Sequence, residues 1–298
     1  MRFLEDNLEI NGMGIGNERM VTMKYEKMNL SVEGQKTGEA ELCLYLLDSV
    51  GEAPARKRPM VIVVPGGGYE HCSKREGEPV AMKFLAMGCH ACILDYSVSP
   101  NRFPVAMREL ALAIATIRDH EKDWNVDQES VLVCGFSAGG HLACSMGVFW
   151  NRPVAYEGIG RTGKEVRPDG LILCYPVITA GEYCHAGSFV SLLGEDASVK
   201  LRQAVSLENH VTNQMPPVFL WHTVTDDTVP VENSLLLAGA MKKNHVNFEM
   251  HLYPSGCHGL SLASKETSGG KDYLVEPGCQ SWILLVQSWI EGQQWKKK

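Results

Sequence analysis

The sequence predicts an α/β fold, in which a mostly parallel central sheet is covered by helices on both faces and carries a small lid insertion. Three observations support this prediction. Short apolar runs such as 60–64 and 131–135 have the composition of buried strands. Segments with helical spacing, such as 105–123, alternate with these runs. No internal repeat or low-complexity linker divides the 298 residues, so we expect a single domain over residues 1–298.

Eight segments are predicted to be strands because they are apolar and β-branched, or because apolar and polar residues alternate in them. They are residues 21–33, 40–47, 60–64, 91–94, 131–135, 170–175, 217–222 and 248–253. The first two are expected to form an antiparallel edge of the sheet. Residues 1–20 are polar and interrupted by glycines, and we expect an N-terminal arm there.

The predicted helices carry their apolar residues on one stripe. In residues 105–123, for example, this stripe is formed by Leu110, Ala113, Ile114 and Ile117. The other helices are expected over residues 79–87, from residue 138 onward, and over residues 232–243 and 279–292.

Two segments depart from this alternation. Residues 151–168 are polar and contain a lone Gly-x-Gly-x-x-Gly pattern, but no strand leads into it, so a surface loop is predicted rather than a phosphate-binding turn. Residues 177–215 are irregular, with a short helical pattern at 198–205. We expect this second segment to form a lid or cap over a site.

Composition and charge exclude several classes of function. The net charge is −7 and the isoelectric point is about 5.8, so neither nucleic acid nor an anionic membrane is the expected partner. Ten cysteines show no disulfide spacing, which favours a reducing compartment. Cys89 and Cys92 form a C-x-x-C pair that enters a strand and is expected to pack in the core. Residues 1–6 lack an apolar signal core, and a soluble, cytoplasmic protein is predicted.

The segment 131–145 carries the strongest chemical signal. Its Gly135-Phe136-Ser137-Ala138-Gly139 sequence follows a predicted strand and begins a predicted helix, which is the setting of a nucleophile elbow. A serine on such a sharp turn takes a strained backbone angle, and glycines on either side let neighbouring backbone pass close by. The helix behind it offers unpaired N–H groups to an oxyanion.

Three further candidates follow the carboxyl ends of other predicted strands. They are the glycine loop Pro65-Gly66-Gly67-Gly68-Tyr69, the pair Asp226 and Asp227, and His258. Sites in parallel sheets lie beyond the carboxyl ends of the strands, so we expect these groups to meet Ser137. His120-Glu121 lacks the second histidine of a zinc motif, and no metal site is predicted.

These residue types suit nucleophilic catalysis. His258 would take the proton of the Ser137 hydroxyl, and a carboxylate would orient the imidazole. Either aspartate can do this, and the spacing to Val229-Pro230 favours Asp226. The backbone N–H groups of Ala138 and of Gly67 or Gly68 would bind the oxyanion. Tyr69 is a candidate for substrate contact, and His222 is expected to be a core hydrogen-bonding residue.

The chain resembles the α/β-hydrolase superfamily, and within it the bacterial esterase/lipase group that includes carboxylesterases and acetylxylan-esterase-like hydrolases. The resemblance extends over residues 40–292 and rests on five motifs. They are the elbow 135–143, the oxyanion loop 65–69, Asp95-Tyr96-Ser97-Val98-Ser99-Pro100, Asp226-Asp227-Thr228-Val229-Pro230 and Cys257-His258-Gly259. Two positions depart from the lipase pattern, since Pro65 replaces a histidine and Ser97 replaces an arginine.

The resemblance implies an α/β-hydrolase fold and ester hydrolysis through an acyl-enzyme, without cofactor or metal. We therefore expect a serine carboxylesterase whose partner is a small-molecule ester of a short acyl chain, with acetyl esters of sugars or xylan fragments as the leading candidates. Two alternatives remain open. One is an arylformamidase or peptidase that uses the same triad, and the other is a non-catalytic ligand-binding protein of the same fold.

Overall fold

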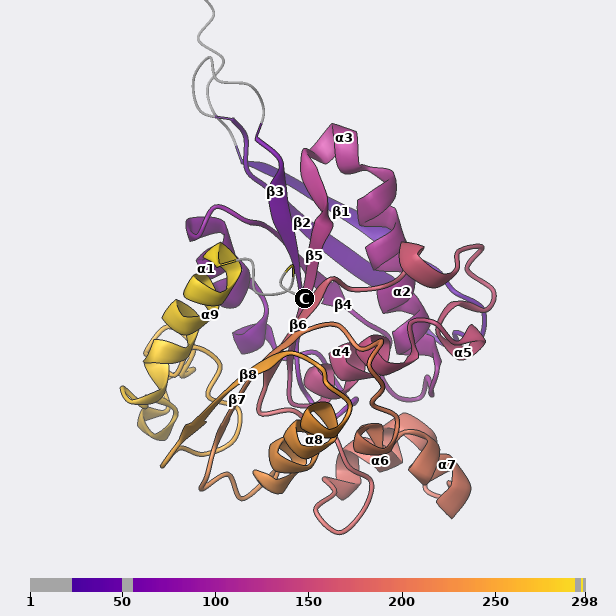
Figure 1. The fold of residues 1–298 in the computed structure, drawn as a ribbon, viewed down its shortest axis with the longest axis vertical. Coiled ribbons are helices and arrows are strands. Elements are labelled where there is room, and N and C mark those ends of the chain that lie inside the picture. The colour runs from indigo at the N-terminus through magenta and orange to yellow at the C-terminus, as the bar shows by residue number, and fades with distance from the viewer. Residues whose placement is uncertain (1–22, 50–55, 293–295, 297–298) are drawn as a thin grey trace, which may run out of the picture.

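A single eight-stranded sheet runs through the computed structural model, which describes residues 23–49, 56–292 and 296 (Figure 1). The N-terminal arm predicted for residues 1–20 lies outside the described residues. The strand order across the sheet is β1-β2-β4-β3-β5-β6-β7-β8. The strands are β1 Lys24–Leu30, β2 Ala40–Leu46, β3 Arg58–Val64, β4 His90–Asp95, β5 Val126–Phe136, β6 Gly170–Cys174, β7 Val218–Thr223 and β8 Phe248–Tyr253.

The sheet is mostly parallel, as predicted. β1 pairs antiparallel with β2, and β2 pairs antiparallel with β4, which confirms the predicted antiparallel edge. The neighbours from β4 through β8 pair in parallel. The carboxyl ends of β3, β5, β7 and β8 therefore lie along one edge of the sheet, where the four predicted site segments begin.

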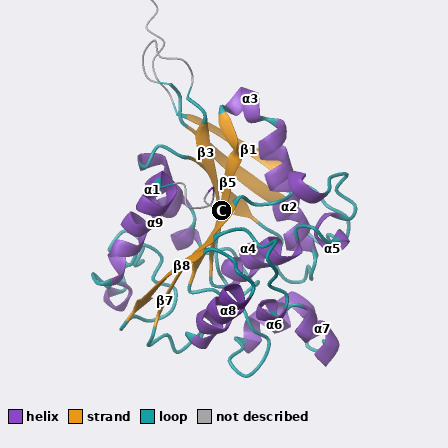
Figure 2. Ribbon diagram, in the orientation of Figure 1, coloured by secondary structure: helices purple, strands orange, loops and turns teal. Residues whose placement is uncertain are grey.

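Helices cover both faces of this sheet, as the alternation predicts (Figure 2). Figure 1 shows α1 and α9 on one side and α2, α4 and α8 on the other. The helices are α1 Glu78–Ala86, α2 Val105–Asp119, α3 Glu121–Trp124, α4 Ala138–Phe149, α5 Pro153–Tyr156, α6 Ala186–Leu193, α7 Val199–Ala204, α8 Glu232–Lys243 and α9 Trp282–Glu291.

Side chains that alternate along β3 belong to two separate hydrophobic cores. Ile62 and Val64 pack in the core that includes α2 and α4, whereas Val61 and Val63 pack in the core beneath α1 and α9. This is the consequence of the two-residue period of a strand whose two faces are both buried. It explains why β3 reads as a continuous apolar run.

Two helical segments differ from the predictions. The helix expected over 105–123 is divided at His120, where α2 ends and the short α3 begins. Helix α6 was not predicted, because its sequence lacks the usual Ser, Thr, Asp or Asn at the N-cap. Its N-cap is the side chain of His185, which accepts a hydrogen bond from the N–H of Ser188.

The expected lid segment, residues 177–215, lies between β6 and β7 and contains α6 and α7. All ten cysteines are free thiols, and Cys89 and Cys92 are buried, which confirms that this pair packs in the core. In the described part of the chain, every helix is too short or too polar to cross a membrane.

Candidate active site

Ser137 stands on a strained turn between β5 and α4. Its φ is 52° and its ψ is −117°, a combination that residues other than glycine rarely adopt. Such strain persists only where the surrounding packing enforces it. A Cβ on Gly135 would lie 2.3 Å from the carbonyl oxygen of Gly139, and a Cβ on Gly139 would lie 2.2 Å from that of Val64. The glycines of the motif therefore allow β3, β5 and α4 to approach closely around the serine.

A continuous hydrogen-bonded chain links Ser137 to His258 and Asp226. The Oγ atom of Ser137 lies 2.8 Å from Nε2 of His258, and Nδ1 of His258 lies 2.6 Å from Oδ2 of Asp226. The three residues come from the loops after β5, β8 and β7. Ser137 is mostly buried, with 8% of the residue exposed. This is the connectivity in which a histidine removes the hydroxyl proton while a carboxylate holds its other nitrogen.

Asp226 rather than Asp227 is the carboxylate of this chain. Its Oδ1 accepts the N–H groups of Thr228 at 3.0 Å and Val229 at 2.9 Å, which fixes the turn after β7. Its Oδ2 also accepts a hydrogen bond from a second imidazole, because Nε2 of the buried His222 lies 3.2 Å away. Asp227 is exposed, and in the described part of the chain its side chain accepts only a long hydrogen bond, 3.4 Å, from the Thr228 hydroxyl.

The pKa of Asp226 is held well below its usual value. Burial alone would raise this pKa, but the hydrogen bonds from His222 and His258, together with the N–H of Val229, outweigh burial. The carboxylate therefore stays charged at neutral pH. A charged carboxylate is what stabilises an imidazolium when His258 takes up a proton.

The oxyanion loop, residues 65–69, presents free N–H groups beside Ser137. Gly67 and Gly68 have φ values of +126° and +65°, and a Cβ on Gly67 would lie 2.1 Å from the carbonyl oxygen of His71. The N–H of Gly66 is already donated to Oε2 of Glu76 at 2.9 Å. Among the described residues, no acceptor is recorded for the N–H groups of Gly67, Gly68 and Ala138. These three donors are available to an oxygen that carries developing charge.

Tyr69, the sequence candidate for substrate contact, lies in the core instead. Only 3% of the residue is exposed, and its hydroxyl lies 2.9 Å from Nδ1 of the buried His141. Burial raises its pKa well above the usual value. Its backbone carbonyl accepts the N–H of Ser99 at 2.8 Å. This placement fits a role in supporting the oxyanion loop and not direct contact with a substrate.

Helix α6 of the insertion lies against the oxyanion loop. The Ser188 hydroxyl would be 3.9 Å from a Cβ on Gly68, and the Ser191 hydroxyl donates to Oε1 of Glu70 at 3.3 Å. Burial, and then the positive charge of His258, lower the pKa of His185 at the start of α6. No sequence motif marks His185 or Ser188, because the lid segment lacks a regular pattern.

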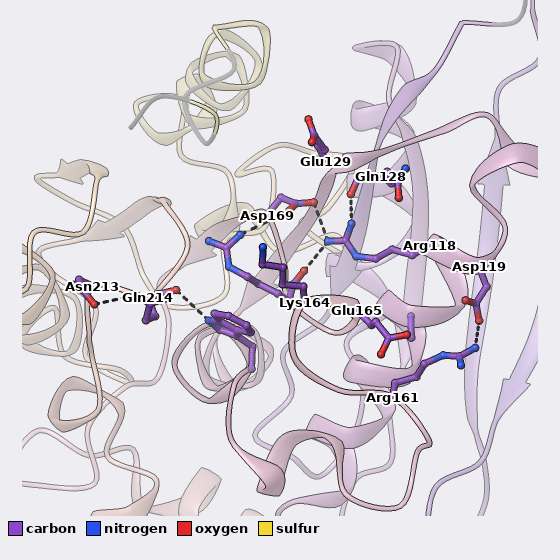
Figure 3. Close-up of a pocket in the computed structure, with 13 residues that line it drawn as sticks. Arg118, Asp119, Gln128, Glu129, Arg161, Lys164, Glu165, Asp169, Asn213 and Gln214 are labelled. Atoms are coloured by element: carbon purple, nitrogen blue, oxygen red, sulfur yellow. Dashed lines mark hydrogen bonds and ion pairs between the residues drawn. The ribbon is translucent and has the colours of Figure 1, made fainter.

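A pocket of about 720 Å³ lies elsewhere, at the amino end of β5 (Figure 3). Several of its charged side chains pair with one another. Arg118 binds Asp169 at 3.0 Å, and Figure 3 shows Arg161 joined to Asp119. None of the described residues that line it is a serine, cysteine or histidine. The described residues also hold no group of three or more His, Cys, Asp or Glu side chains that could bind a metal ion.

Comparisons with known proteins agree with this geometry. The BD-FAE family matches residues 49–241. An endo-1,4-beta-xylanase B from Butyrivibrio fibrisolvens is 38% identical over 72% of this chain, and an acetylxylan esterase from Xylanibacter ruminicola is 28% identical over 82% of it. The matched regions are only 34% and 47% of those two proteins, so this chain spans a third to a half of their length.

Solved structures match over nearly the whole chain. An acetyl ester-xyloside bifunctional hydrolase from Caldicellulosiruptor lactoaceticus is 38% identical, with a TM-score of 0.74, over 87% of this chain and 89% of that one. A carboxylesterase from Lactobacillus plantarum is 28% identical, with a TM-score of 0.79, over 93% of this chain and all of that one. From its sequence, its sheet and the geometry at Ser137, this chain belongs to the BD-FAE family of α/β-hydrolase esterases.

Proposed function

We propose that this protein is a serine carboxylesterase that removes short acyl groups, acetyl above all, from sugars or xylan fragments. The observation that carries the proposal is the chain of short hydrogen bonds from Ser137 through His258 to Asp226. The N–H groups of Gly67, Gly68 and Ala138, which have no acceptor among the described residues, complete the set of groups that ester hydrolysis needs.

In the proposed first half-reaction, Oγ of Ser137 attacks the ester carbonyl while Nε2 of His258 takes the hydroxyl proton. The carbonyl oxygen becomes an oxyanion and receives hydrogen bonds from the N–H groups of Gly67, Gly68 and Ala138. His258 then gives its proton to the leaving alcohol oxygen, and an acyl-serine remains. In the second half-reaction, His258 removes a proton from water, and the water oxygen attacks the acyl carbonyl. The bond between the acyl carbon and Oγ of Ser137 then breaks, His258 returns its proton to Oγ, and the carboxylic acid is released.

Two observations support a small, polar substrate. First, the relatives include an acetylxylan esterase and an acetyl ester-xyloside bifunctional hydrolase, which favours acetyl esters of carbohydrate as substrates. Second, next to the oxyanion loop, the N-cap of α6 is the partly exposed His185, whereas the hydroxyls of Ser188 and Ser191 are buried and bonded to His185 and Glu70. An imidazole can bind a hydroxyl of a sugar, whereas a long acyl chain needs apolar surface.

The test compares wild type with Ser137→Ala on p-nitrophenyl acetate, butyrate and octanoate, followed by acetate release from acetylated xylo-oligosaccharides. We expect the highest kcat/KM for acetate among the p-nitrophenyl esters, release of acetate from the oligosaccharides, and background rates for the variant. Equal rates for the variant and wild type would refute the proposed nucleophile. A preference for octanoate would refute the small acyl pocket.

Labelling with a fluorophosphonate probe separates the remaining alternatives. An arylformamidase or peptidase would be labelled at Ser137 but would favour an amide substrate over the esters. A non-catalytic ligand-binding protein would leave Ser137 unlabelled in the folded state. We expect labelling in wild type, with none in Ser137→Ala.

A further inference from the structure

Glu76 is a buried carboxylate that the proposed mechanism does not use. It ends a short 3-10 helix, Lys74–Glu76, and only 3% of the residue is exposed. Burying a charged group is costly unless hydrogen bonds satisfy it. Each carboxylate oxygen of Glu76 accepts a hydrogen bond. One donor is the N–H of Gly66 and the other is the hydroxyl of Tyr175.

The first donor is the oxyanion loop. The N–H of Gly66 donates to Oε2 of Glu76 at 2.9 Å. Gly66 packs closely against both this carboxylate and the nucleophile. A Cβ on Gly66 would lie 2.8 Å from Oε2 of Glu76 and 3.0 Å from Cβ of Ser137. Glu76 thereby sets the direction of the backbone that continues into Gly67 and Gly68.

The second donor is Tyr175, the residue that follows β6. Its hydroxyl donates to Oε1 of Glu76 at 2.6 Å and accepts the N–H of Ser261 at 2.8 Å. Burial, with the negative charge of Glu76 adding to it, raises the pKa of Tyr175 well above the usual value, so the phenol keeps its proton and donates. The tyrosine ring also packs edge-on against the His258 ring, with 5.1 Å between the centroids.

The residue next to Glu76 also contacts the histidine loop, residues 254–261. The guanidinium of Arg75 donates to the carbonyl oxygen of Gly259 at 2.7 Å, and its own carbonyl accepts the Ser261 hydroxyl at 2.8 Å. The 3-10 helix therefore contacts the loop that carries the oxyanion donors on one side and the loop that carries the catalytic base on the other.

We propose that Glu76 is a positioning residue that fixes the oxyanion loop and the histidine loop relative to each other. This inference rests on the proposed function, because it concerns how Gly67, Gly68 and His258 are held for the reaction at Ser137. The donors of an oxyanion hole act mainly on the transition state. A change at Glu76 should therefore lower kcat while leaving KM nearly unchanged.

The variant Glu76→Gln tests this proposal. Glutamine keeps the length and shape of the side chain but has a single acceptor oxygen, so either Gly66 or Tyr175 loses its acceptor whichever way the amide turns. We expect kcat on p-nitrophenyl acetate to fall about 10- to 100-fold, part of what the loss of a whole oxyanion donor costs. KM should change less than about threefold, and fluorophosphonate labelling should slow in parallel with kcat.

Glu109→Gln is the matched control. Glu109 is also buried, and its two oxygens accept the side-chain amide of Gln35 at 2.6 Å and the N–H of Ser97 at 2.7 Å. Among the described residues, its side-chain oxygens are hydrogen-bonded to Gln35 and Ser97, and neither belongs to the oxyanion loop or the histidine loop. We expect this variant to lose as much thermal stability as Glu76→Gln while keeping wild-type kcat.

A kcat for Glu76→Gln within twofold of wild type, or an equal loss in Glu109→Gln, would overturn the proposal. If Glu76→Gln does not fold, Tyr175→Phe replaces it, because this change removes one donor to Glu76 and keeps the ring against His258. Wild-type kcat in Tyr175→Phe would then overturn it. Failure of the proposed function looks different, because wild type and Ser137→Ala would then be equally inactive.

Discussion

Nε2 of His222 lies 3.2 Å from Oδ2 of Asp226, the same carboxylate oxygen that lies 2.6 Å from Nδ1 of His258. The other ring nitrogen of His222 is 2.7 Å from the Ser234 hydroxyl, which can donate to it. In that tautomer His222 donates through Nε2 to Asp226 and to the carbonyl oxygen of Val229. The fully buried carboxylate is thereby fixed in position before any substrate arrives.

Substitution of the two adjacent aspartates should have very different effects. Asp226→Asn removes the charge that stabilises the His258 imidazolium, and we expect kcat on p-nitrophenyl acetate to fall by about 10³- to 10⁴-fold. Asp227→Asn changes an exposed residue and should stay within about twofold of wild type. The matched pair differs by one position in the same loop. A larger loss of kcat in Asp227→Asn than in Asp226→Asn would show that Asp227, and not Asp226, stabilises the His258 imidazolium.

The lowered pKa of Asp226 also predicts how stability depends on pH. A carboxylate whose folded-state pKa is depressed stabilises the fold above its unfolded pKa of about 3.9, and this contribution is lost as the pH falls toward the folded pKa. We expect the difference in free energy of unfolding between wild type and Asp226→Asn to be fully present well above this unfolded pKa and to shrink as the pH falls below it.

Urea unfolding of both proteins at pH 7, 5 and 3.5 measures this difference, and the other acidic groups cancel because the two proteins share them. The difference should be similar at pH 7 and 5 and smaller at pH 3.5. A difference that stays constant down to pH 3.5 would mean that the folded pKa of Asp226 is not depressed.

The sequence was sufficient to predict the fold because its signals are local. Residues 60–64 of β3 and 131–136 of β5 are short, buried apolar runs rich in β-branched residues, the composition typical of a strand buried on both faces. The amphipathic stripe of residues 105–123 predicts a helix, but not its interruption at His120, since the pattern continues past it. Helix α6 could not be predicted, because an imidazole replaces the usual capping side chain.

The predicted site residues come together for a topological reason. Ser137, Asp226 and His258 each follow a strand of the same parallel sheet, so their strand ends identify them. Tyr69 follows a strand equally closely, yet its side chain turns into the core toward His141. Glu76 and His185 were missed because their contacts come from irregular segments distant in sequence. A buried glutamate beside Arg75 looks, in sequence, like any pair of surface charges.

The elbow glycines should be the least replaceable residues outside the triad. A Cβ on Gly139 would lie 2.2 Å from the carbonyl oxygen of Val64 and 2.3 Å from that of Pro65, and neither backbone group can move without displacing β3. We expect Gly139→Ala to lower the free energy of unfolding by more than about 3 kcal/mol. Urea unfolding checks this.

Gly239→Ala is the control for this prediction. Gly239 lies in α8, is exposed, and has nothing within 4 Å of where its Cβ would be. Alanine there should stabilise the protein by about 0.5–1 kcal/mol, because it favours the helix. If Gly139→Ala and Gly239→Ala had the same stability, close packing would not be the reason why position 139 requires glycine.

The final prediction concerns His185, the N-cap of α6, the helix that lies against the oxyanion loop. Its Nδ1 accepts the backbone N–H of Ser188 at 3.3 Å, so the ring proton is on Nε2, and burial keeps the ring neutral at pH 7. No partner for Nε2 is recorded among the described residues. On the proposed function, this N–H is free to donate to a hydroxyl of the sugar.

His185→Asn separates substrate binding from helix capping. Asparagine is a good N-cap and should preserve α6, but it is too short to carry the Nε2 donor. We expect KM for acetylated xylo-oligosaccharides to rise about fivefold to tenfold, the effect of one neutral hydrogen bond, with kcat/KM for p-nitrophenyl acetate within about twofold of wild type. His210→Asn, at the other end of the insertion and bonded to the carbonyl of Gln203, should leave both unchanged. An equal loss on both substrates in His185→Asn would show that His185 acts on the reaction centre itself and not on the sugar.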